Sequence, residues 1–343
     1  MATTAAPGSA DVGETPEVKT EPSRRVRLAA AVLIGLGSAL FTAFTFHRPD
    51  FRPDFEYWWR AARMLLAGGN PYHMTPGMAD WPMENLLFYP LPTLLLTVPL
   101  ARLSLPVAGA TFMGISGGLL AWLVSRDGLW RLWLFGSASY FMACRLGQWS
   151  PLSMAVAFIP AAGFLAAMKP NLGLALLAYR PTWRAALGCV VAGLVSFAVL
   201  PSWLVDWHSN ASYVSLLVPH PAPISLTGGP ILLLVLLRWR RSEARLLLVM
   251  ACVPQLLFWA DQLPLFLIPR TKGEMKALVF WGALCFFVWK IWFEPHPAYV
   301  LARNPFVFCA IYLPCLIMIL RRPNEGDLPE WIERRLPARM RSR

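Results

Sequence analysis

The sequence predicts an all-α polytopic membrane protein, a bundle of about ten transmembrane helices. Hydrophobic residues make up 57% of the 343 residues and charged residues only 15%, whereas soluble chains carry roughly 25% charged residues. The mean hydropathy of the chain is +0.49. Long apolar runs alternate with short arginine clusters along most of the sequence. A chain of this kind buries its apolar side chains in a lipid bilayer.

The formal net charge of +12 does not indicate a nucleic-acid partner. The arginines stand at the ends of apolar runs, where basic residues set membrane topology and meet anionic lipid headgroups. No basic patch is interleaved with aromatic residues in the way that a nucleic-acid groove requires. The six cysteines lie in or beside apolar runs without a CxxC pair, so they predict small buried hydrophobes and neither a zinc site nor a disulfide framework.

The N-terminal part of the chain predicts a tail followed by a first span. Residues 1–24 contain almost no large apolar side chain and are expected to form a disordered tail. A basic cluster that includes Arg24 and Arg27 precedes an apolar run over 28–46, which is long enough to cross a bilayer and lacks a cleavage site. The positive-inside rule then places the N-terminus in the cytoplasm and residues 47–86 in a first outer loop.

Within the first outer loop, residues 54–67 predict a short helix. Asp54 can begin it, and the Gly68-Gly69 pair can end it. Apolar and charged side chains are expected on different faces, with Glu56 on the charged one. This pattern is typical of a helix that lies in the plane of the membrane interface.

The rest of the chain, up to residue 320, predicts further spans in the same membrane domain. Several are shorter than the roughly 20 residues that cross a bilayer alone, and prolines interrupt many of them, so we expect broken helices that line a cavity. Residues 206–230 predict a second outer loop, and 321–343 a basic cytoplasmic tail. The further apolar runs cover 86–101, 105–124, 129–143, 151–168, 185–205, 231–237, 246–259, 263–268, 277–293 and 306–320.

Two aspartates mark the start of the predicted interfacial helix. Asp50 and Asp54 stand four residues apart in a tandem Arg-Pro-Asp-Phe repeat. A carboxylate at this place can cap the free N–H groups of the helix. It can also act as a general base that takes a proton from an acceptor hydroxyl. The spacing alone leaves both roles open.

Three polar residues inside apolar runs are further candidates for a functional site. Lys169 is a functional candidate because ionisable residues are unfavourable in a membrane span, although its side chain could also snorkel to the interface. Asp261 needs a partner if it is buried. Gln148 could donate a hydrogen bond to a sugar hydroxyl or cap a helix. The histidines show no metal-ligand spacing, so the sequence predicts no metal site and no cofactor.

Several segments together resemble a known family. The stretches DFEYWWRAA (54–62), LLAGGNPY (65–72) and FYPL (88–91) are similar to the first outer loop of glycosyltransferase family 87. Its members are integral-membrane, GT-C-type enzymes that use polyprenyl-phosphate sugars. LGQ (146–148), Lys169-Pro170 and WADQLP (259–264) resemble later elements of that family. Tyr89-Pro90-Leu91-Pro92 replaces the consecutive prolines of the family pattern.

The resemblance implies a GT-C-like bundle over 25–320. It also implies an enzyme that transfers a hexose with inversion at the anomeric carbon, and family association favours a mannose-like sugar. The donor is a polyprenyl-phosphate sugar, the acceptor is a lipid or glycan hydroxyl, and the active site lies on the outer face of the plasma membrane. The resemblance aligns Asp54 with the catalytic base. The expected donor-binding residues are Lys169, Gln148, His208, Asp261 and Gln262, and the expected substrate-lining residues are Asp50, Tyr57, Trp58, Tyr72, Tyr89 and Trp259.

Two other function classes remain open on the sequence. A transporter or flippase for a lipid or small solute would equally use broken helices and the intramembrane charges of Lys169 and Asp261. A tryptophan-rich outer loop with paired aspartates suits it less well. A non-catalytic subunit would keep the fold without the chemistry. Dependence of turnover on Asp54 distinguishes the enzyme from both.

Overall fold

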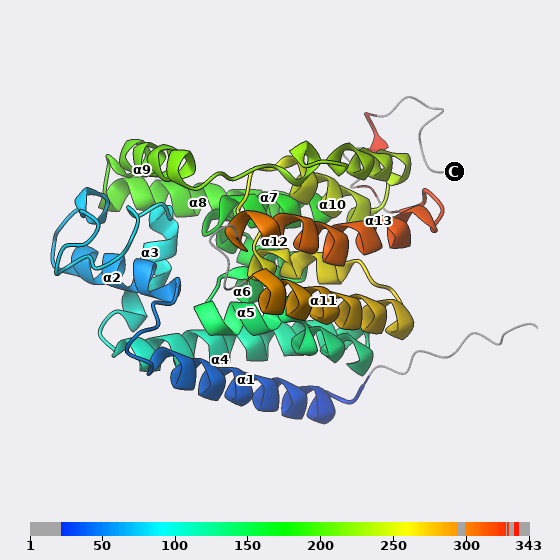
Figure 1. Ribbon diagram of the computed structural model, residues 1–343, viewed down its shortest axis with the longest axis horizontal. Helices are drawn as coiled ribbons and strands as arrows, with labels where there is room; N and C mark the ends of the chain where they lie inside the picture. The colour runs from blue at the N-terminus through cyan, green and yellow to red at the C-terminus, as the bar shows by residue number, and fades with distance from the viewer. Residues whose placement is uncertain (1–21, 294–298, 327, 329–332, 336–343) are drawn as a thin grey trace, which may run out of the picture.

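The computed structural model describes residues 22–293, 299–326, 328 and 333–335, and all regular elements among them are helical (Figure 1). One isolated bridge between Met78 and Trp81 is the sole β-type pairing in these ranges. The α-helices are α1 Arg24–Phe46, α2 Phe55–Leu66, α3 Leu91–Thr97, α4 Leu105–Val124, α5 Ala138–Leu146, α6 Ser150–Ser153, α7 Pro170–Tyr179, α8 Trp183–Val199, α9 Trp203–Leu217, α10 Ser242–Cys252, α11 Lys272–Phe293, α12 Tyr299–Val307 and α13 Leu313–Leu320.

Shorter helical turns of other kinds complete the bundle. One π-helix, η10 Phe308–Tyr312, joins α12 to α13. The 3-10 helices are η1 Pro71–His73, η2 Val98–Leu100, η3 Ser125–Asp127, η4 Leu129–Gly136, η5 Met154–Ala157, η6 Pro160–Ala167, η7 Pro223–Ser225, η8 Gly229–Arg238 and η9 Trp259–Leu267.

The described residues contain four helices that are long and apolar enough to cross a membrane. They cover Arg24–Phe46, Leu105–Asp127, Lys272–Phe293 and Arg303–Leu320. The consecutive helices α8 and α9 meet at an angle of 102° and make a fifth candidate if they count as one span. A helical membrane protein is therefore confirmed, but the predicted number of about ten spans is not.

The lower number has a physical cause in the 3-10 runs. The helices η4, η6, η8 and η9 are 8 to 10 residues long, whereas 3-10 runs usually stop after about 3–4 residues. Prolines stand at the first turn of η6 and η8 and inside η9. A rise of about 2 Å per residue lets ten such residues cover about 20 Å. The predicted broken helices are present, and they are too short to count as spans.

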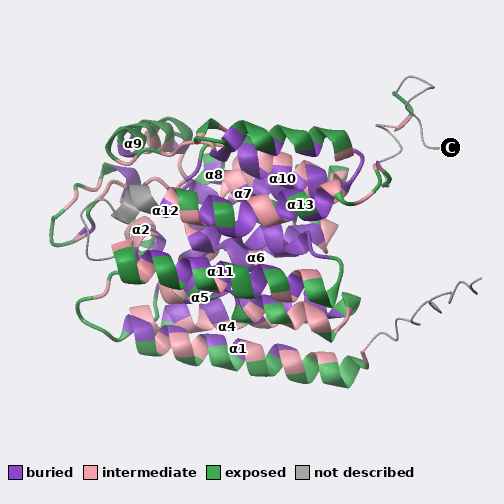
Figure 2. Cartoon of the chain, turned by 45° about the vertical axis from the view of Figure 1, so that its right-hand side comes forward, coloured by how far each residue is buried: buried purple, intermediate pink, exposed green. Residues whose placement is uncertain are grey.

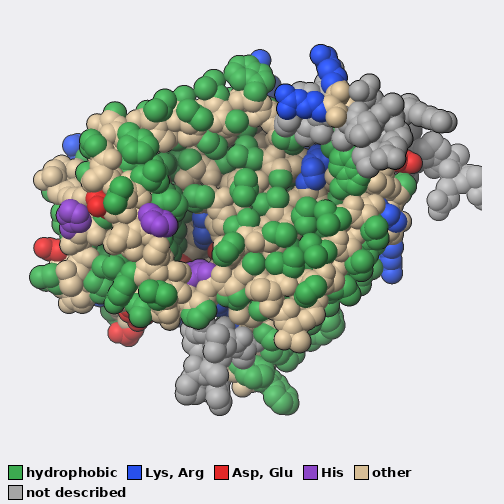
Figure 3. All heavy atoms as spheres, turned by 90° about the horizontal axis from the view of Figure 1, so that it is seen from above, with side chains coloured by type: hydrophobic (Ala, Val, Ile, Leu, Met, Phe, Trp, Pro, Cys, Tyr) green, Lys and Arg blue, Asp and Glu red, His purple; other side chains and the backbone are tan. Residues whose placement is uncertain are grey.

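Helices α1 and α4 lie side by side (Figure 2) and pack through small residues. A Cβ atom added to Gly35 would lie 2.9 Å from the carbonyl oxygen of Gly114, and one added to Gly118 would lie 3.1 Å from that of Ala31. Such close backbone approach is typical of helix pairs in membranes. Opposite this seam, α1 exposes Leu33, Leu36 and other large apolar side chains. In Figure 3 apolar side chains likewise spread over the face shown.

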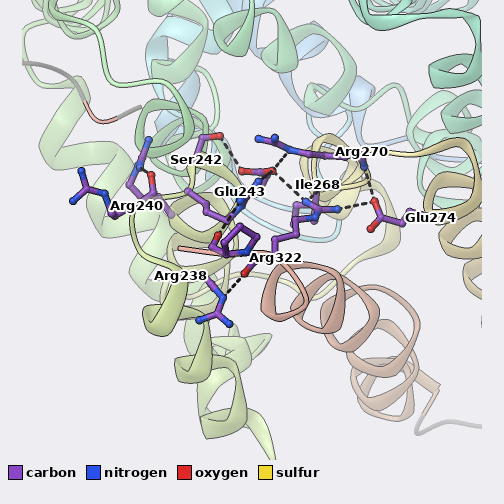
Figure 4. Close-up of polar contacts among 11 residues, drawn as sticks. Arg238, Arg240, Ser242, Glu243, Ile268, Arg270, Glu274 and Arg322 are labelled. Atoms are coloured by element: carbon purple, nitrogen blue, oxygen red, sulfur yellow. Dashed lines mark hydrogen bonds and ion pairs between the residues drawn. The ribbon is translucent and has the colours of Figure 1, made fainter. Parts of the chain in front are cut away.

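One end of the bundle is held together by arginines. Glu243 at the start of α10 is 1% exposed and pairs with three guanidinium groups (Figure 4). Its Oε1 lies 2.5 Å from Arg270 Nε, 3.1 Å from Arg322 Nη1 and 3.5 Å from Arg241 Nη2. These contacts join α10, the start of α11 and the end of α13. We call this the basic end.

The helices α2, α3 and α9 gather at the opposite end (Figure 1). The predicted helix at 54–67 is observed as α2, but Glu56 on its charged face does not point to water. Glu56 is 1% exposed and pairs with Arg52 and Arg60 at 2.8 and 2.7 Å. The predicted second outer loop differs too, since α9 extends as far as Leu217.

Candidate active site

Asp54 occupies the position that precedes α2, but its side chain does not cap that helix. The residue has right-handed helical dihedrals, and its carboxylate makes no capping hydrogen bond. Instead, Gln148 Nε2 donates a hydrogen bond to Asp54 Oδ2. The sequence left two roles open for this aspartate, and the structure excludes the role of helix cap.

Gln148 reaches Asp54 because of the glycine before it. Gly147 ends α5 in the left-handed region, with φ 69°, which is accessible to glycine at no steric cost. A Cβ atom at Gly147 would lie 2.7 Å from the Cβ of Phe55. The end of α5 is thus pressed against the start of α2. Gln148 follows this turn and is 2% exposed.

Lys169 joins the far side of Gln148 to Asp261. The lysine stands directly before Pro170, the first residue of α7. Its Nζ lies 3.0 Å from Gln148 Oε1 and 2.5 Å from Asp261 Oδ1. The side chains of the ion pair are 13% and 7% exposed. Asp261 in η9 therefore has the partner that its burial demands.

The four side chains Asp54, Gln148, Lys169 and Asp261 form one hydrogen-bonded line, which we call the acid–lysine line. Burial raises the pKa of Asp54 to about 6, against the opposing charge of Lys169. The charge of Asp261 acts in the same direction as burial. A carboxylate with such a pKa is deprotonated at neutral pH and still basic enough to accept a proton.

Aromatic side chains pack around the start of α2. The ring of Trp58 lies edge-on to Tyr89, with centroids 4.5 Å apart, and 6.1 Å from Trp149. Tyr57 lies edge-on to Trp81 at 5.7 Å. Burial raises the pKa of Tyr89 well above its usual value, and the charge of Asp54 adds to this. Tyr57, Trp58 and Tyr89, three of the expected substrate-lining residues, thus belong to the aromatic packing around the start of α2.

Other predicted site residues lie apart from the acid–lysine line. Asp50 and His208 are exposed. The Tyr72 hydroxyl donates to the carbonyl oxygen of Tyr89, and Trp259 packs edge-on to a phenylalanine ring. Within the described residues, no hydrogen bond or ion pair links any of these four to Asp54 or Lys169.

Gln262 belongs to a separate polar network. Its Oε1 accepts a hydrogen bond of 2.7 Å from the Tyr312 hydroxyl, and its Nε2 donates to Gln255 Oε1 at 3.3 Å. All three side chains are buried. Gln262 therefore ties η9 to the C-terminal helices, while its neighbour Asp261 holds Lys169.

Two residues that the sequence did not single out interact electrostatically with the site. Arg303 is 3% exposed, lies over the ring of Phe258 at 4.9 Å and lowers the pKa of Asp54. Burial lowers the pKa of His220, and the charges of Asp261 and Lys169 act on it. The signal for Arg303 was an ionisable residue at the edge of an apolar run. Nothing in the local sequence distinguished His220.

An apolar groove of about 650 Å³ opens between α3, η6 and α8. Pro92, Phe164, Met168 and Val191 are among its lining residues. The Thr93 hydroxyl donates to the carbonyl oxygen of Met168 at 2.6 Å, and Met168 precedes Lys169. The groove is therefore lined by a residue that directly precedes Lys169 in the sequence.

Within the described residues, no group of three or more His, Cys, Asp or Glu side chains could hold a metal ion. Comparison of the chain with protein-family models, with curated proteins and with solved structures found no match.

Proposed function

We propose that the protein is an integral-membrane hexosyltransferase that uses a polyprenyl-phosphate sugar as donor. The observation that carries the proposal is the acid–lysine line. It places a carboxylate with a pKa of about 6 and an ammonium group on opposite ends of one amide side chain. Acceptor deprotonation and departure of a phosphate need these two groups side by side.

In the proposed reaction, Asp54 takes the proton from a hydroxyl of the lipid or glycan acceptor. The hydroxyl oxygen attacks the anomeric carbon of the hexose from the face opposite the phosphate. The bond between that carbon and the phosphate oxygen breaks, and its electron pair leaves with the polyprenyl phosphate. The product has inverted configuration. The resemblance to glycosyltransferase family 87 supports a mannose-like sugar.

Lys169 is the proposed partner of the leaving phosphate. An ammonium group has three hydrogen-bond donors, and Gln148 and Asp261 accept two of them. The third can donate to a phosphate oxygen, where a charge-assisted hydrogen bond is about twice as strong as a neutral one. Arg303, whose charge reaches Asp54, adds to the positive potential. The apolar groove beside Met168 suits the polyprenyl chain.

The proposed orientation follows from the arginines. Basic residues favour the cytoplasmic side of a membrane protein, so the basic end faces the cytoplasm and Asp54 faces outward. Donor and acceptor would then meet at the outer surface of the plasma membrane.

A lipid or solute transporter is the second candidate. The buried Lys169–Asp261 pair between broken helices favours it, because intramembrane charges often line a transport path. A transporter has no need for a base at Asp54. Substrate flux into vesicles that is insensitive to loss of Asp54 would identify it.

The decisive experiment compares Asp54→Asn with the parent in membranes supplied with radiolabelled polyprenyl-phosphate sugars. The variant should lose about 10²- to 10⁴-fold in transfer rate, the usual contribution of a general base. Asp80→Asn, an exposed aspartate in the same loop, is the matched control and should keep full activity. Equal transfer by Asp54→Asn and the parent would contradict the role of Asp54. No transfer from any donor by the parent would favour the transporter.

A further inference from the structure

A second pocket lies at the basic end and shares no lining residue with the acid–lysine line. Its volume is about 490 Å³. The lining comes mainly from the end of η3, the end of η5, the end of α7 with the turn after it, and the start of α10. The residues are Asp127, Ala157, Phe158, Tyr179, Arg180, Pro181, Ser242, Arg245 and Leu328.

The charges in this pocket do not balance. Asp127 pairs with Arg131 at 3.4 Å. Neither Arg180 nor Arg245 makes an ion pair with any carboxylate of the described residues. The neighbouring cluster is different, since Arg241, Arg270 and Arg322 all pair with Glu243. Figure 4 labels Arg270 and Arg322 of these three. Two guanidinium groups without an anionic partner therefore border one pocket.

Backbone carbonyl groups hold both guanidinium groups in place. Arg180 Nη1 donates to the carbonyl oxygens of Ala157 and Phe158 at 3.2 and 3.1 Å. Arg245 Nε donates to that of Ala178 at 3.0 Å, and Arg245 Nη1 to that of Arg240 at 2.7 Å. In the described structure, Arg180 Nε and Nη2 and Arg245 Nη2 have no protein acceptor. The carbonyl contacts hold these donors in place before any ligand binds, which favours binding of a phosphate group.

The helix that begins at the pocket does not add to this positive charge. Ser242 is the first residue of α10, an 11-residue helix without a side-chain cap, but Glu243 stands in the same first turn and its carboxylate accepts a hydrogen bond from the Ser242 hydroxyl. The donors that can bind an anion in this pocket are therefore those of Arg180 and Arg245.

The apolar groove begins a few residues away along the chain. Trp183 and Arg184, shortly after the Arg180-Pro181 turn, line it together with further residues of α8 as far as Val195. Ala161 and Phe164 line it as well and follow Phe158 of the pocket. A polar pocket and an apolar groove thus adjoin at two segments, as a lipid headgroup and its acyl chain require.

We propose that this pocket binds the phosphate of an anionic phospholipid, with an acyl chain in the end of the groove that Trp183 and Arg184 line. The polyprenyl chain of the proposed donor would occupy the other end, at Met168. Basic pockets between transmembrane helices bind acidic lipid headgroups in this way. The site lies at the end of the bundle opposite Asp54 and does not depend on the proposed reaction.

The test measures lipid binding by the full-length protein, purified in a mild detergent. Native mass spectrometry and thermal unfolding would compare phosphatidylglycerol, phosphatidylcholine and glycerol phosphate. Arg180→Gln removes the exposed guanidinium of the pocket, and Arg180→Lys keeps its charge but not its planar fork. Arg126→Gln removes an equal charge from an exposed site at the same end outside the pocket.

The parent should bind phosphatidylglycerol in preference to phosphatidylcholine and melt at a higher temperature with it. Arg180→Gln should weaken this binding about tenfold, since hydrogen bonds to charged groups have that magnitude. Arg126→Gln should bind as the parent does. If Arg180→Gln does not fold, Arg180→Lys should weaken binding and serves instead.

Three results would overturn the proposal. Unchanged binding in the folded Arg180 variants would exclude the pocket. An equal loss in Arg126→Gln would reduce the effect to general attraction between charges. If glycerol phosphate stabilises the parent as strongly as phosphatidylglycerol does, the pocket binds a free phosphate ester and not a lipid.

Discussion

Lys169 Nζ lies 2.5 Å from Asp261 Oδ1, and this ion pair connects two elements that are 92 positions apart in the sequence. Lys169 stands at the start of α7 and Asp261 in the 3-10 helix η9. Through Gln148 the same lysine is linked to Asp54 at the start of α2. The pair therefore joins the packing of the bundle to the chemistry of the site.

The pH dependence of transfer should have an acid limb with an apparent pKa of about 6, the value for Asp54. A base acts in its deprotonated form, so the rate should fall as the pH drops through this value. Lys169→Gln removes a charge that lowers the pKa of Asp54, so it should move the limb to higher pH. Asp261→Asn removes a charge that raises this pKa and should move it to lower pH. Initial rates between pH 4.5 and 8 would test both shifts, and a limb that stays in place in both variants would contradict the coupling.

Single substitutions in the Lys169–Asp261 pair should be more harmful than the double one. Lys169→Met leaves a buried carboxylate without its partner, and loss of one member of a buried pair lowers the free energy of unfolding by about 3–5 kcal/mol. Lys169→Met combined with Asp261→Leu removes both charges of the pair and should recover most of that loss. Unfolding of the parent, Lys169→Met, Asp261→Leu and the double variant in detergent gives the interaction energy between the two residues. Simple additivity would show that the pair does not couple.

Gly35→Ala should weaken the contact between α1 and α4. The added Cβ would lie 2.9 Å from the carbonyl oxygen of Gly114, and overpacking of this kind lowers the free energy of unfolding by about 1–3 kcal/mol. Gly37→Ala, on the same helix, meets no atom within 4 Å and serves as the control. Because alanine favours helix more than glycine by about 1 kcal/mol, this control should be neutral or stabilising. Equal behaviour of the two variants in thermal unfolding would count against the close helix contact.

Glu243→Gln should loosen the basic end. The carboxylate accepts from Arg270 and Arg322, and hydrogen bonds to charged groups contribute about 1.5–3 kcal/mol each. The neutral amide leaves three guanidinium groups without their shared anion. We expect a lower melting temperature and faster proteolysis near residue 322. Glu325→Gln, an exposed acid nearby, should behave like the parent.

The local elements were predictable where short-range signals decide them. The helix expected at 54–67 is observed as Phe55–Leu66, and the first span expected at 28–46 as Arg24–Phe46. The charged residue at the helix start and Gly68 at its end act on neighbours within a few residues, so these start and stop signals can be read from the sequence alone. The buried position of Glu56 was not predictable, because Arg52 and the packing of α2 determine it together.

The sequence by itself determined the class of the protein and its candidate groups. Composition and apolar runs require a helical membrane protein, and Asp54, Gln148, Lys169 and Asp261 were all recognisable as polar residues in unusual places. Tertiary structure decided which of them meet. Gln148 lies 94 positions from Asp54 and 21 from Lys169, and contacts at such separations depend on how helices pack. The same packing left His208 outside and brought in Arg303, because a periodic pattern describes one helix face and not the helix that covers it.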